Sequence, residues 1–204
     1  MISLICPTRG RKEKFDRMVD SALATCCGEI EIISGSNGGD KYVDINFPLD
    51  CPTVYMWNEM AKEARGDFFM LAADDIIFST PCWDQALEIK DKPHVYHYQD
   101  SRDTDGTPHP IVNRKWADTL GYFLPPIFMH WYVDTWTVEI AKSKDCFTHL
   151  RDYLLIHDKD SDKGLADETH NRIRRMGWRE RDKQMWECSN GYREIDKRLI
   201  GDAL

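Results

Sequence analysis

The sequence predicts an α/β fold in which helices flank a mainly parallel β-sheet. The first observation is that short apolar runs alternate with amphipathic segments through the first half of the 204-residue chain. Apolar runs of about four to eight residues between turn residues are typical of buried strands, and strands that alternate with helices are typical of parallel sheets. The second observation is that polar loops follow Cys6, Ile33 and Ala73, at the ends of three predicted strands. Because ligands of such sheets bind at the carboxyl ends of the strands, we expect these loops to share one site.

The elements of the first half are each predicted from a local pattern. Strands are expected at 2–6, 30–33, 42–47 and 68–78, and helices at 12–25, 54–64 and 83–89. The helix at 12–25 carries an apolar stripe that would face the sheet. The stripe consists of Phe15, Met18, Val19, Ala22 and Leu23. Arg65-Gly66 ends the helix at 54–64, since glycine commonly follows the last turn of a helix.

The second half is predicted to mix strands and helices. Strands are expected at 95–99 and 154–157, a further element begins at 111–116, and helices are expected within 133–142 and at 166–176, 179–188 and 192–204. Pro125-Pro126 excludes a continuous helix across 120–129. The length fits one domain with a small appendage. We therefore expect a domain over residues 1–165 and a helical C-terminal extension, 166–204, packed on it.

The charge of the chain disfavours a general nucleic-acid coat. The formal net charge is -8, and a strongly acidic balance repels phosphate backbones. The region from Arg172 to Lys183 is nevertheless basic, with Arg174, Arg175, Arg179 and Arg181 between these ends. A solvated helical face is the ordinary interpretation of such a run, and a surface for an anionic acceptor such as nucleic acid or phospholipid is the alternative.

Cysteine usage and hydropathy indicate the compartment. The chain has seven cysteines, an odd number, and none of them has the CxxC spacing. These features favour reduced thiols in a cytoplasmic protein and disfavour a zinc site. No apolar run reaches membrane-spanning length, and the first residues lack the pattern of a signal peptide. We expect no integral membrane segment.

Two neighbouring carboxylates interrupt the apolar run at 68–78. They belong to Asp74 and Asp75. Burying unpaired carboxylates is costly, so we expect the pair at the open end of the strand, facing a ligand. Hard oxygen ligands suit Mg²⁺ or Mn²⁺, with substrate phosphates filling the remaining positions. The alternative is an ordinary turn at a strand end, where aspartate is common.

Several short motifs occur in one order along the whole chain. They are Pro7-Thr8-Arg9-Gly10-Arg11, Trp57-Asn58-Glu59-Met60-Ala61, Ala64-Arg65-Gly66-Asp67-Phe68, Asp74-Asp75, Trp83-Asp84, His130-Trp131-Tyr132-Val133-Asp134-Thr135, and His157 followed by Gly164 and Asp167-Glu168-Thr169. Their order and spacing resemble the glycosyltransferases of the GT-A fold, especially small family-2-like enzymes of bacteria and their phages. The resemblance departs from the family pattern at two points. The acidic residues are adjacent and are not Asp-x-Asp, and Ser34 and Ser36 stand where many relatives place an acidic residue for the base.

The resemblance implies a Rossmann-like GT-A domain that transfers a hexosyl or pentosyl group from a nucleotide-diphosphate sugar, with a UDP-sugar expected first. A divalent cation, Mn²⁺ or Mg²⁺, would neutralise the leaving diphosphate. We expect Asp75 to hold this cation with Asp74 nearby. His157 could complete its shell, because Mn²⁺ accepts an imidazole more readily than Mg²⁺ does. A purely structural role is the alternative for this histidine.

The donor would be held by groups from three loops and one helix. The candidate donor-binding residues are Pro7, Thr8, Arg9, Arg11, Ser34, Ser36, Asn37, Asn58 and Asp74. Arginine suits bidentate recognition of phosphate, and small polar groups suit the base and the ribose. The alternatives are a solvated turn for the arginines, a plain glycine-rich turn for the serines and an exposed helix position for Asn58.

An inverting transfer needs a general base for the acceptor hydroxyl. Asp134 is the candidate catalytic residue, because the aromatic setting of Trp131, Tyr132 and Trp136 would raise its pKa. The alternative is a helix N-cap, a position that aspartate prefers. A lipid-linked glycan, a protein and a hydroxylated DNA base of a phage are all compatible acceptors. The missing membrane segment disfavours the first, and the basic region 172–183 mildly favours nucleic acid. The rival functions are a non-catalytic nucleotide- or sugar-binding module and a sugar-nucleotide nucleotidyltransferase, the latter disfavoured because only Gly10 offers a glycine in the first loop.

Overall fold

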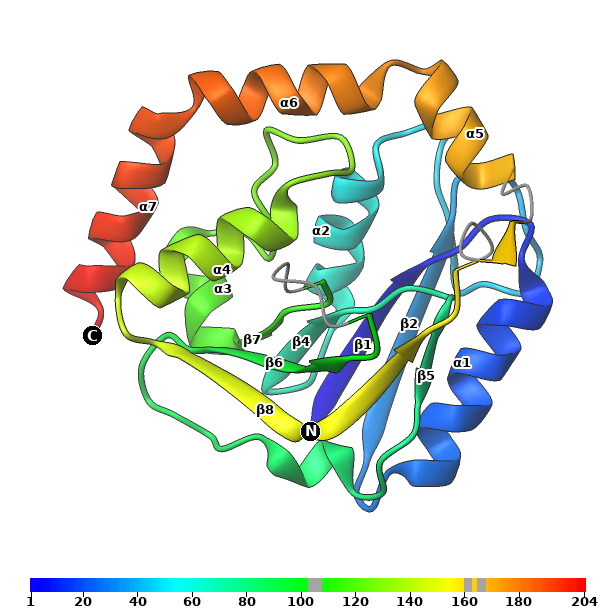
Figure 1. Cartoon of the computed structure of the whole chain (residues 1–204), viewed down its shortest axis with the longest axis horizontal. Helices are drawn as coiled ribbons and strands as arrows, with labels where there is room; N and C mark the ends of the chain where they lie inside the picture. The colour runs from blue at the N-terminus through cyan, green and yellow to red at the C-terminus, as the bar shows by residue number, and fades with distance from the viewer. Residues whose placement is uncertain (103–107, 160–162, 165–167) are drawn as a thin grey trace.

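The computed structural model describes residues 1–102, 108–159, 163–164 and 168–204 (Figure 1). The strands are β1 (Ile2–Pro7), β2 (Ile30–Ser36), β3 (Ile45–Asn46), β4 (Phe68–Leu71), β5 (Ile76–Phe78), β6 (Val95–Asp100), β7 (Ile111–Asn113) and β8 (Phe147–His157). The α-helices are α1 (Lys12–Thr25), α2 (Thr53–Glu63), α3 (Arg114–Leu120), α4 (Val133–Ser143), α5 (Glu168–Arg175), α6 (Trp178–Cys188) and α7 (Asn190–Asp202), and η1 (Trp83–Ala86) is a 3-10 turn. The predicted α/β fold is confirmed, and the helix expected at 12–25 has the expected bounds.

The strands form one sheet among the described residues, in the order β3-β2-β1-β4-β7-β6-β8-β5. The pairs β1–β2, β1–β4, β2–β3 and β6–β8 are parallel. The pairs β4–β7, β6–β7 and β5–β8 are antiparallel. The carboxyl ends of β1, β2 and β4 therefore meet at one edge, as the sequence predicted.

One predicted strand is wrong in its extent. The apolar run at 68–78 forms two strands, because the chain leaves the sheet after Leu71 and turns at Asp74 and Asp75. It then re-enters the sheet as β5, which is the outermost strand beside β8. At this turn the carboxylate of Asp74 pairs with Arg11. The amide N–H of Asp158 donates to the carbonyl of Asp75 over 2.7 Å, which fixes the turn beside the end of β8.

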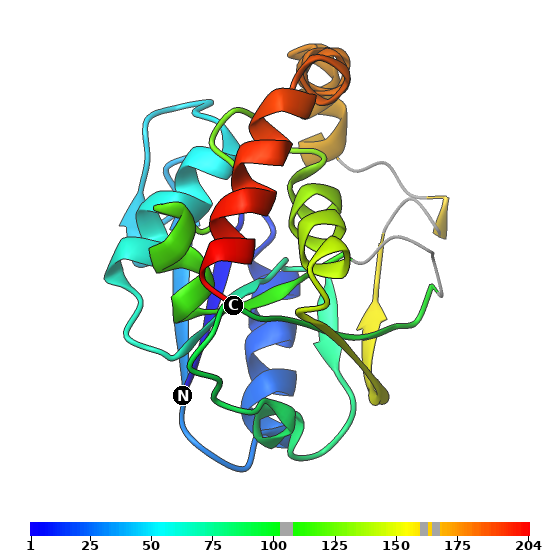
Figure 2. The same ribbon diagram turned by 90° about the vertical axis from the view of Figure 1, so that its left-hand side faces the viewer.

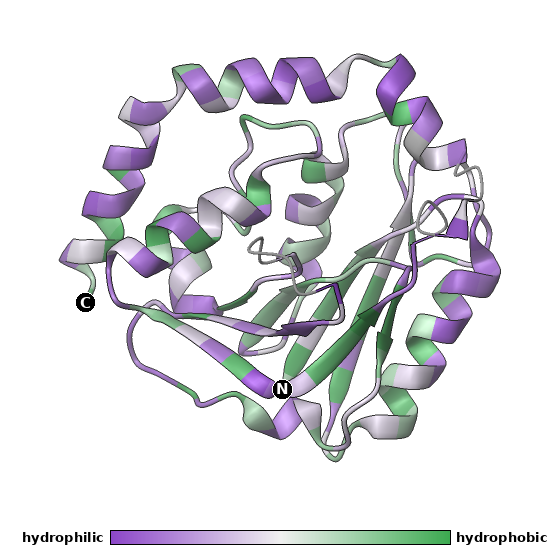
Figure 3. Cartoon of the chain, in the orientation of Figure 1, coloured by the Kyte–Doolittle hydropathy of each residue, from purple (hydrophilic) through white to green (hydrophobic). Residues whose placement is uncertain are grey.

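Successive residues of the central strands point to opposite faces of the sheet. Leu4 and Cys6 of β1 pack in a cluster with Phe15 and Met18 of α1. Ile5, between them, packs in a second cluster with residues of α2, α3 and α4. This is the two-residue alternation of a strand that is buried on both faces. Figure 3 shows the same distribution, with hydrophobic residues concentrated on the strands and largely hydrophilic residues on α5 and α6.

The C-terminal helices return to the body of the molecule. Helix α7 packs against α3 and α4 (Figure 2), and its Ile200 is fully buried in the cluster that contains Trp136 of α4. Trp186 of α6 stacks on Tyr132, with ring centroids 5.4 Å apart. The boundary at 165/166 stays a prediction. No helix within the described part of the chain is both long enough and apolar enough to span a membrane.

The expectation that all thiols are reduced is wrong for one pair. Cys27 and Cys82 form a disulfide across 55 residues of sequence. The amide of Cys82 donates to the carbonyl of Thr25 at the end of α1, and this contact brings the two cysteines together. No CxxC spacing announces such a pair, so the sequence pattern alone could not reveal it.

Candidate active site

A pocket of about 230 Å³ opens at the carboxyl edge of the central strands. Its walls come from the loops after β1, β2 and β4, from the loop before α4, and from the end of β8 and helix α5. Lining residues that were predicted from the sequence are Pro7, Thr8, Arg9, Arg11, Asn37, Asp75, Asp134 and His157. The convergence of three distant segments on one cavity is what the parallel arrangement of β1, β2 and β4 produces.

The two adjacent aspartates have different surroundings. Asp75 lines the pocket. Asp74 is 1% exposed, accepts a hydrogen bond from the hydroxyl of Thr8 over 2.7 Å, and accepts another from Nε of Arg11 over 2.9 Å. Burial raises the pKa of Asp74 to about 6, although the charge of Arg11 opposes this shift. Asp74 therefore holds the loop after β1 through Thr8 and Arg11, whereas Asp75 faces the pocket.

His157 lies between two carboxylates. Its Nδ1 is 3.1 Å from Oδ2 of Asp100, and its Nε2 is 3.6 Å from Oδ1 of Asp75. A carboxylate accepts and does not donate, so the short contact to Asp100 places a proton on Nδ1. The other nitrogen, Nε2, faces Asp75 and is the one that could bind a cation. A histidine that is oriented in this way by a carboxylate is a common metal ligand.

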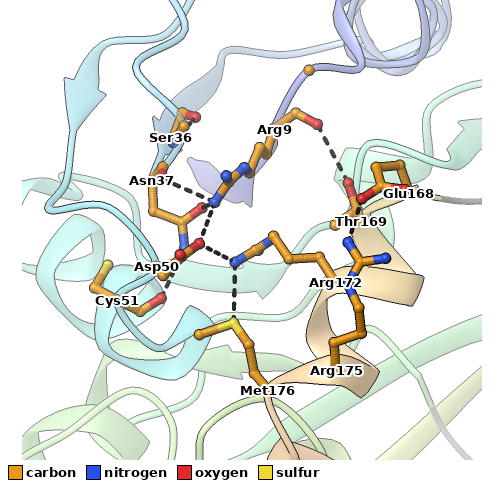
Figure 4. Close-up of polar contacts among 12 residues, drawn as sticks. Arg9, Ser36, Asn37, Asp50, Cys51, Glu168, Thr169, Arg172, Arg175 and Met176 are labelled. Carbon is orange, nitrogen blue, oxygen red and sulfur yellow. Dashed lines mark hydrogen bonds and ion pairs between the residues drawn. The ribbon is translucent and has the colours of Figure 1, made fainter.

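Three arginines, Arg9, Arg11 and Arg172, line the pocket, and Figure 4 shows Arg9 and Arg172 pointing toward Asp50. Nη1 of Arg9 donates to the carbonyl of Asn37 over 3.1 Å and to Asp50 over 2.7 Å. Nη1 of Arg172, on α5, donates to the same oxygen of Asp50 over 2.6 Å. The hydrogen bond from Arg9 holds the pKa of Asp50 below its usual range, and the charge of Arg172 adds to this effect. One carboxylate thus serves two guanidinium groups, and the cluster keeps a net positive charge.

Three predicted donor-binding residues have partners in the surrounding scaffold. The hydroxyl of Ser34 donates to Asp44 over 2.7 Å, and that of Ser36 donates to Asp40 over 2.5 Å. The amide of Asn58 donates to the carbonyl of Leu124 over 2.8 Å, and its oxygen accepts from the amides of residues 123 and 124. These three side chains hold loops and are not among the described residues that line the pocket. The exposed-helix interpretation of Asn58 is wrong, since its side chain bonds the backbone of residues 123 and 124, and the donor-binding role of the three residues stays a prediction.

Asp134 lines the pocket, as do Trp131 and Lys159. Burial raises its pKa, against hydrogen bonds from Thr135. The N-cap of α4 is Tyr132, whose φ of 68° is left-handed, so Asp134 is not the capping residue. This leaves a partly buried carboxylate of raised basicity facing the cavity, which is suited to accept a proton.

Three residues of the site have no motif that the sequence analysis recognised. Asp182 of α6 is fully buried and accepts from the amide of Met129 over 2.8 Å, from that of His130 over 2.8 Å and from that of Trp131 over 2.9 Å. Asp100 orients His157, and His109 lines the pocket. Their roles depend on long-range packing, which leaves no local spacing signal. Asp167, named in the resemblance, lies outside the described residues.

Comparison with solved structures identifies the fold. The chain is similar to TarS 1-349 of S. aureus in complex with UDP, with a TM-score of 0.60, 12% identity, and coverage of 76% of this chain and 60% of that one. It is similar to the mannosyltransferase PcManGT of Pyrobaculum calidifontis in complex with GDP-Man and Mn2+, with a TM-score of 0.62, 10% identity, and coverage of 77% and 56%. It is also similar to glucosyl-3-phosphoglycerate synthase of Mycobacterium tuberculosis, with a TM-score of 0.59, 11% identity, and coverage of 82% and 81%.

These similarities define the class of fold. The chain has the GT-A fold, which is the fold of these glycosyltransferases. No protein-family model and no curated protein sequence matches the chain. The chain spans 60% of the TarS fragment and 56% of the mannosyltransferase, so the activities of those proteins are not transferred whole.

Proposed function

We propose that this protein is a metal-dependent glycosyltransferase that moves a sugar from a nucleotide-diphosphate sugar to a hydroxyl acceptor. The observation that carries the proposal is the shared pocket of Asp75, His157, Asp134 and three arginines. Structural neighbours support it, because solved complexes of this fold contain UDP, or GDP-Man with Mn2+. We propose a UDP-sugar as the first donor to test.

The residues present suit a divalent cation. Asp75 supplies a carboxylate, and Nε2 of His157 lies 3.6 Å from Oδ1 of Asp75. Asp100 holds the orientation of the His157 ring through Nδ1. A cation held there would neutralise the charge that develops on the leaving diphosphate. Arg9 and Arg172 line the same pocket and bind the same phosphates, since guanidinium groups match phosphate oxygens in bidentate geometry.

Asp134 acts as the general base in this proposal. Its raised pKa makes the carboxylate a better proton acceptor than an ordinary aspartate. The acceptor hydroxyl loses its proton to Asp134 as its oxygen bonds to the anomeric carbon, and the bond from that carbon to the diphosphate breaks. Trp131, also in the wall, offers a face on which the acceptor can stack. A base on the acceptor side favours inversion at the anomeric carbon.

The acceptor is proposed from the outer surface of α5 and α6. The basic residues of this region divide into two groups, because Arg172 turns to the pocket whereas Arg174, Arg175 and Arg179 are exposed. Exposed arginines beside the acceptor wall suit a polyanion, so we propose a hydroxylated base in phage DNA, with a glycan as the alternative. Charge reversal of these three residues should weaken DNA binding and reduce its salt dependence. Binding that is indifferent to salt would favour the glycan.

The decisive experiment is hydrolysis and binding of a panel of nucleotide sugars with and without Mn²⁺. We expect turnover of one donor that needs the cation, and loss of it in Asp75→Asn. If no donor is bound or hydrolysed, the enzyme proposal fails and a non-catalytic module becomes the better interpretation. A nucleotidyltransferase would instead release diphosphate from a nucleoside triphosphate and a sugar phosphate, so a parallel assay supplies these two substrates and measures diphosphate release.

A further inference from the structure

A second histidine lies beside the Asp75–His157 pair. His109 lines the pocket, and its ring centroid is 5.0 Å from that of His157. Nδ1 of His109 is 3.1 Å from the carbonyl oxygen of Leu71. A carbonyl oxygen only accepts hydrogen bonds, so Nδ1 carries the proton and Nε2 carries the lone pair.

The lone pair of His109 has no hydrogen-bond partner among the described residues. The side chain is 5% exposed, and Nε2 is a buried polar atom without a partner. A buried polar atom left unpaired costs about 1–3 kcal/mol, and such atoms in folded proteins call for an explanation. A ligand that accepts this lone pair would supply one.

The rings of His109 and His157 have the same hydrogen-bonding arrangement. Each ring donates from Nδ1 to a fixed acceptor, Asp100 for His157 and Leu71 for His109, which leaves both Nε2 atoms basic. Metal-bound imidazoles have this arrangement, because the acceptor fixes the tautomer and the ring orientation. Asp100, His109 and His157 each offer a ligand atom, and these atoms lie within 4.8 Å of one another.

The backbone at His109 is also held in an uncommon conformation. Its φ is 63°, in the left-handed region. Such a conformation is strained for a residue with a side chain and costs about 1 kcal/mol or more. The neighbouring Pro110 accepts from the amide of Leu71 over 3.0 Å, so pairing with β4 holds the strained residue in place. The fold therefore maintains His109 against the pocket at a cost in stability.

We propose that His109 is a further protein ligand of the divalent cation, beside Asp75 and His157. The inference rests on the proposed function and deepens it by naming the kind of cation. Two imidazole nitrogens and one carboxylate form a donor set that prefers Mn²⁺, Co²⁺ or Zn²⁺ to Mg²⁺, which favours oxygen ligands and keeps its waters. Asp100 acts as a positioning residue for His157 and is not itself required as a ligand.

The variant His109→Asn tests the proposal. Asparagine tolerates the left-handed conformation, and its amide can donate to Leu71 in place of Nδ1, whereas the Nε2 lone pair is lost. We expect calorimetry on the full chain, without donor, to give a Mn²⁺ affinity at least about tenfold weaker than that of the native protein. The Mg²⁺ affinity should change less than about twofold. His94→Asn is the matched control, because His94 lies just before β6, bonds Thr148 and is not among the residues that line the pocket.

A spectroscopic measurement on the native protein makes the test independent of the variant's folding. Pulsed electron paramagnetic resonance of the Mn²⁺-loaded protein, with ¹⁵N-labelled histidine, should report two bound imidazole nitrogens. A single bound nitrogen, or an unchanged Mn²⁺ affinity in a folded His109→Asn variant, overturns the inference. If Asp75→Asn loses the cation while His109→Asn keeps it, the proposed function survives and this inference alone fails. If the native protein binds none of these cations, both fail.

Discussion

Arg11, which lines the pocket, forms an ion pair with the buried Asp74, with Nη2 of Arg11 2.5 Å from Oδ1 of Asp74. This pair separates the roles of two aspartates that the sequence presents as equivalent. Asp74 has its oxygens directed at Arg11 and Thr8, whereas Asp75 faces the cavity. The charge of Asp74 therefore belongs to the scaffold, and the charge of Asp75 is available to a cation.

Replacement of Asp74 by asparagine should affect the stability of the protein, whereas the same replacement of Asp75 should affect ligand binding. Asp74→Asn leaves the partly exposed guanidinium of Arg11 without its charge partner, so we expect the free energy of unfolding to fall by about 2 kcal/mol. Asp75→Asn should leave the unfolding transition nearly unchanged and abolish metal-dependent donor binding. Denaturant unfolding and calorimetric titration of donor with Mn²⁺ measure the two effects. Loss of stability in Asp75→Asn and not in Asp74→Asn would reverse the assignment.

Asp182 should influence acceptor binding indirectly, by positioning the loop 129–131. Its two oxygens accept three backbone amides of the loop 129–131, and asparagine can offer them only one acceptor oxygen. We therefore expect Asp182→Asn to displace His130 and Trp131, to raise the KM for the acceptor and to leave donor hydrolysis nearly intact.

Glu180→Gln is the matched control for Asp182→Asn, because Glu180 is exposed on the same helix. Steady-state kinetics with acceptor and donor varied separately gives the comparison. A variant that loses donor and acceptor binding equally would indicate general unfolding, and this would contradict a positioning role for Asp182.

The sequence predicts those parts of the fold that local periodicity encodes. The stripe that begins at Phe15 predicts α1 with its actual bounds, and the polar ends of β1, β2 and β4 predict the edge that carries the pocket. The break between β4 and β5 is not predictable, because both strands are apolar and their separation depends on pairing with β8 across the sheet. The role of Asp182 is not predictable for the same reason, since its partners lie more than fifty residues earlier in the chain.

Arg172 should contribute to donor affinity through charge. It reaches the pocket from α5 and shares Asp50 with Arg9. We expect Arg172→Gln to weaken binding of a nucleoside diphosphate by about tenfold, since a charge-assisted contact to phosphate is replaced by a neutral one. Arg174→Gln is the control, because Arg174 is exposed on the same helix. Calorimetry at two ionic strengths measures the affinities, and equal behaviour of the two variants would remove Arg172 from the donor site.

The dependence of turnover on pH should report the ionisation of Asp134. Burial raises the pKa of this carboxyl above its ordinary value of 3.8. The base works in its deprotonated form, so kcat/KM should be constant at neutral pH and should fall as the pH drops through this raised pKa. The fall should therefore begin at a higher pH than for an ordinary aspartate. Asp134→Asn should lower kcat by about 10²- to 10⁴-fold and remove this acidic limb, while donor binding persists. If the variant keeps both its rate and its acidic limb, another group is the base and Asp134 has only a structural role in α4.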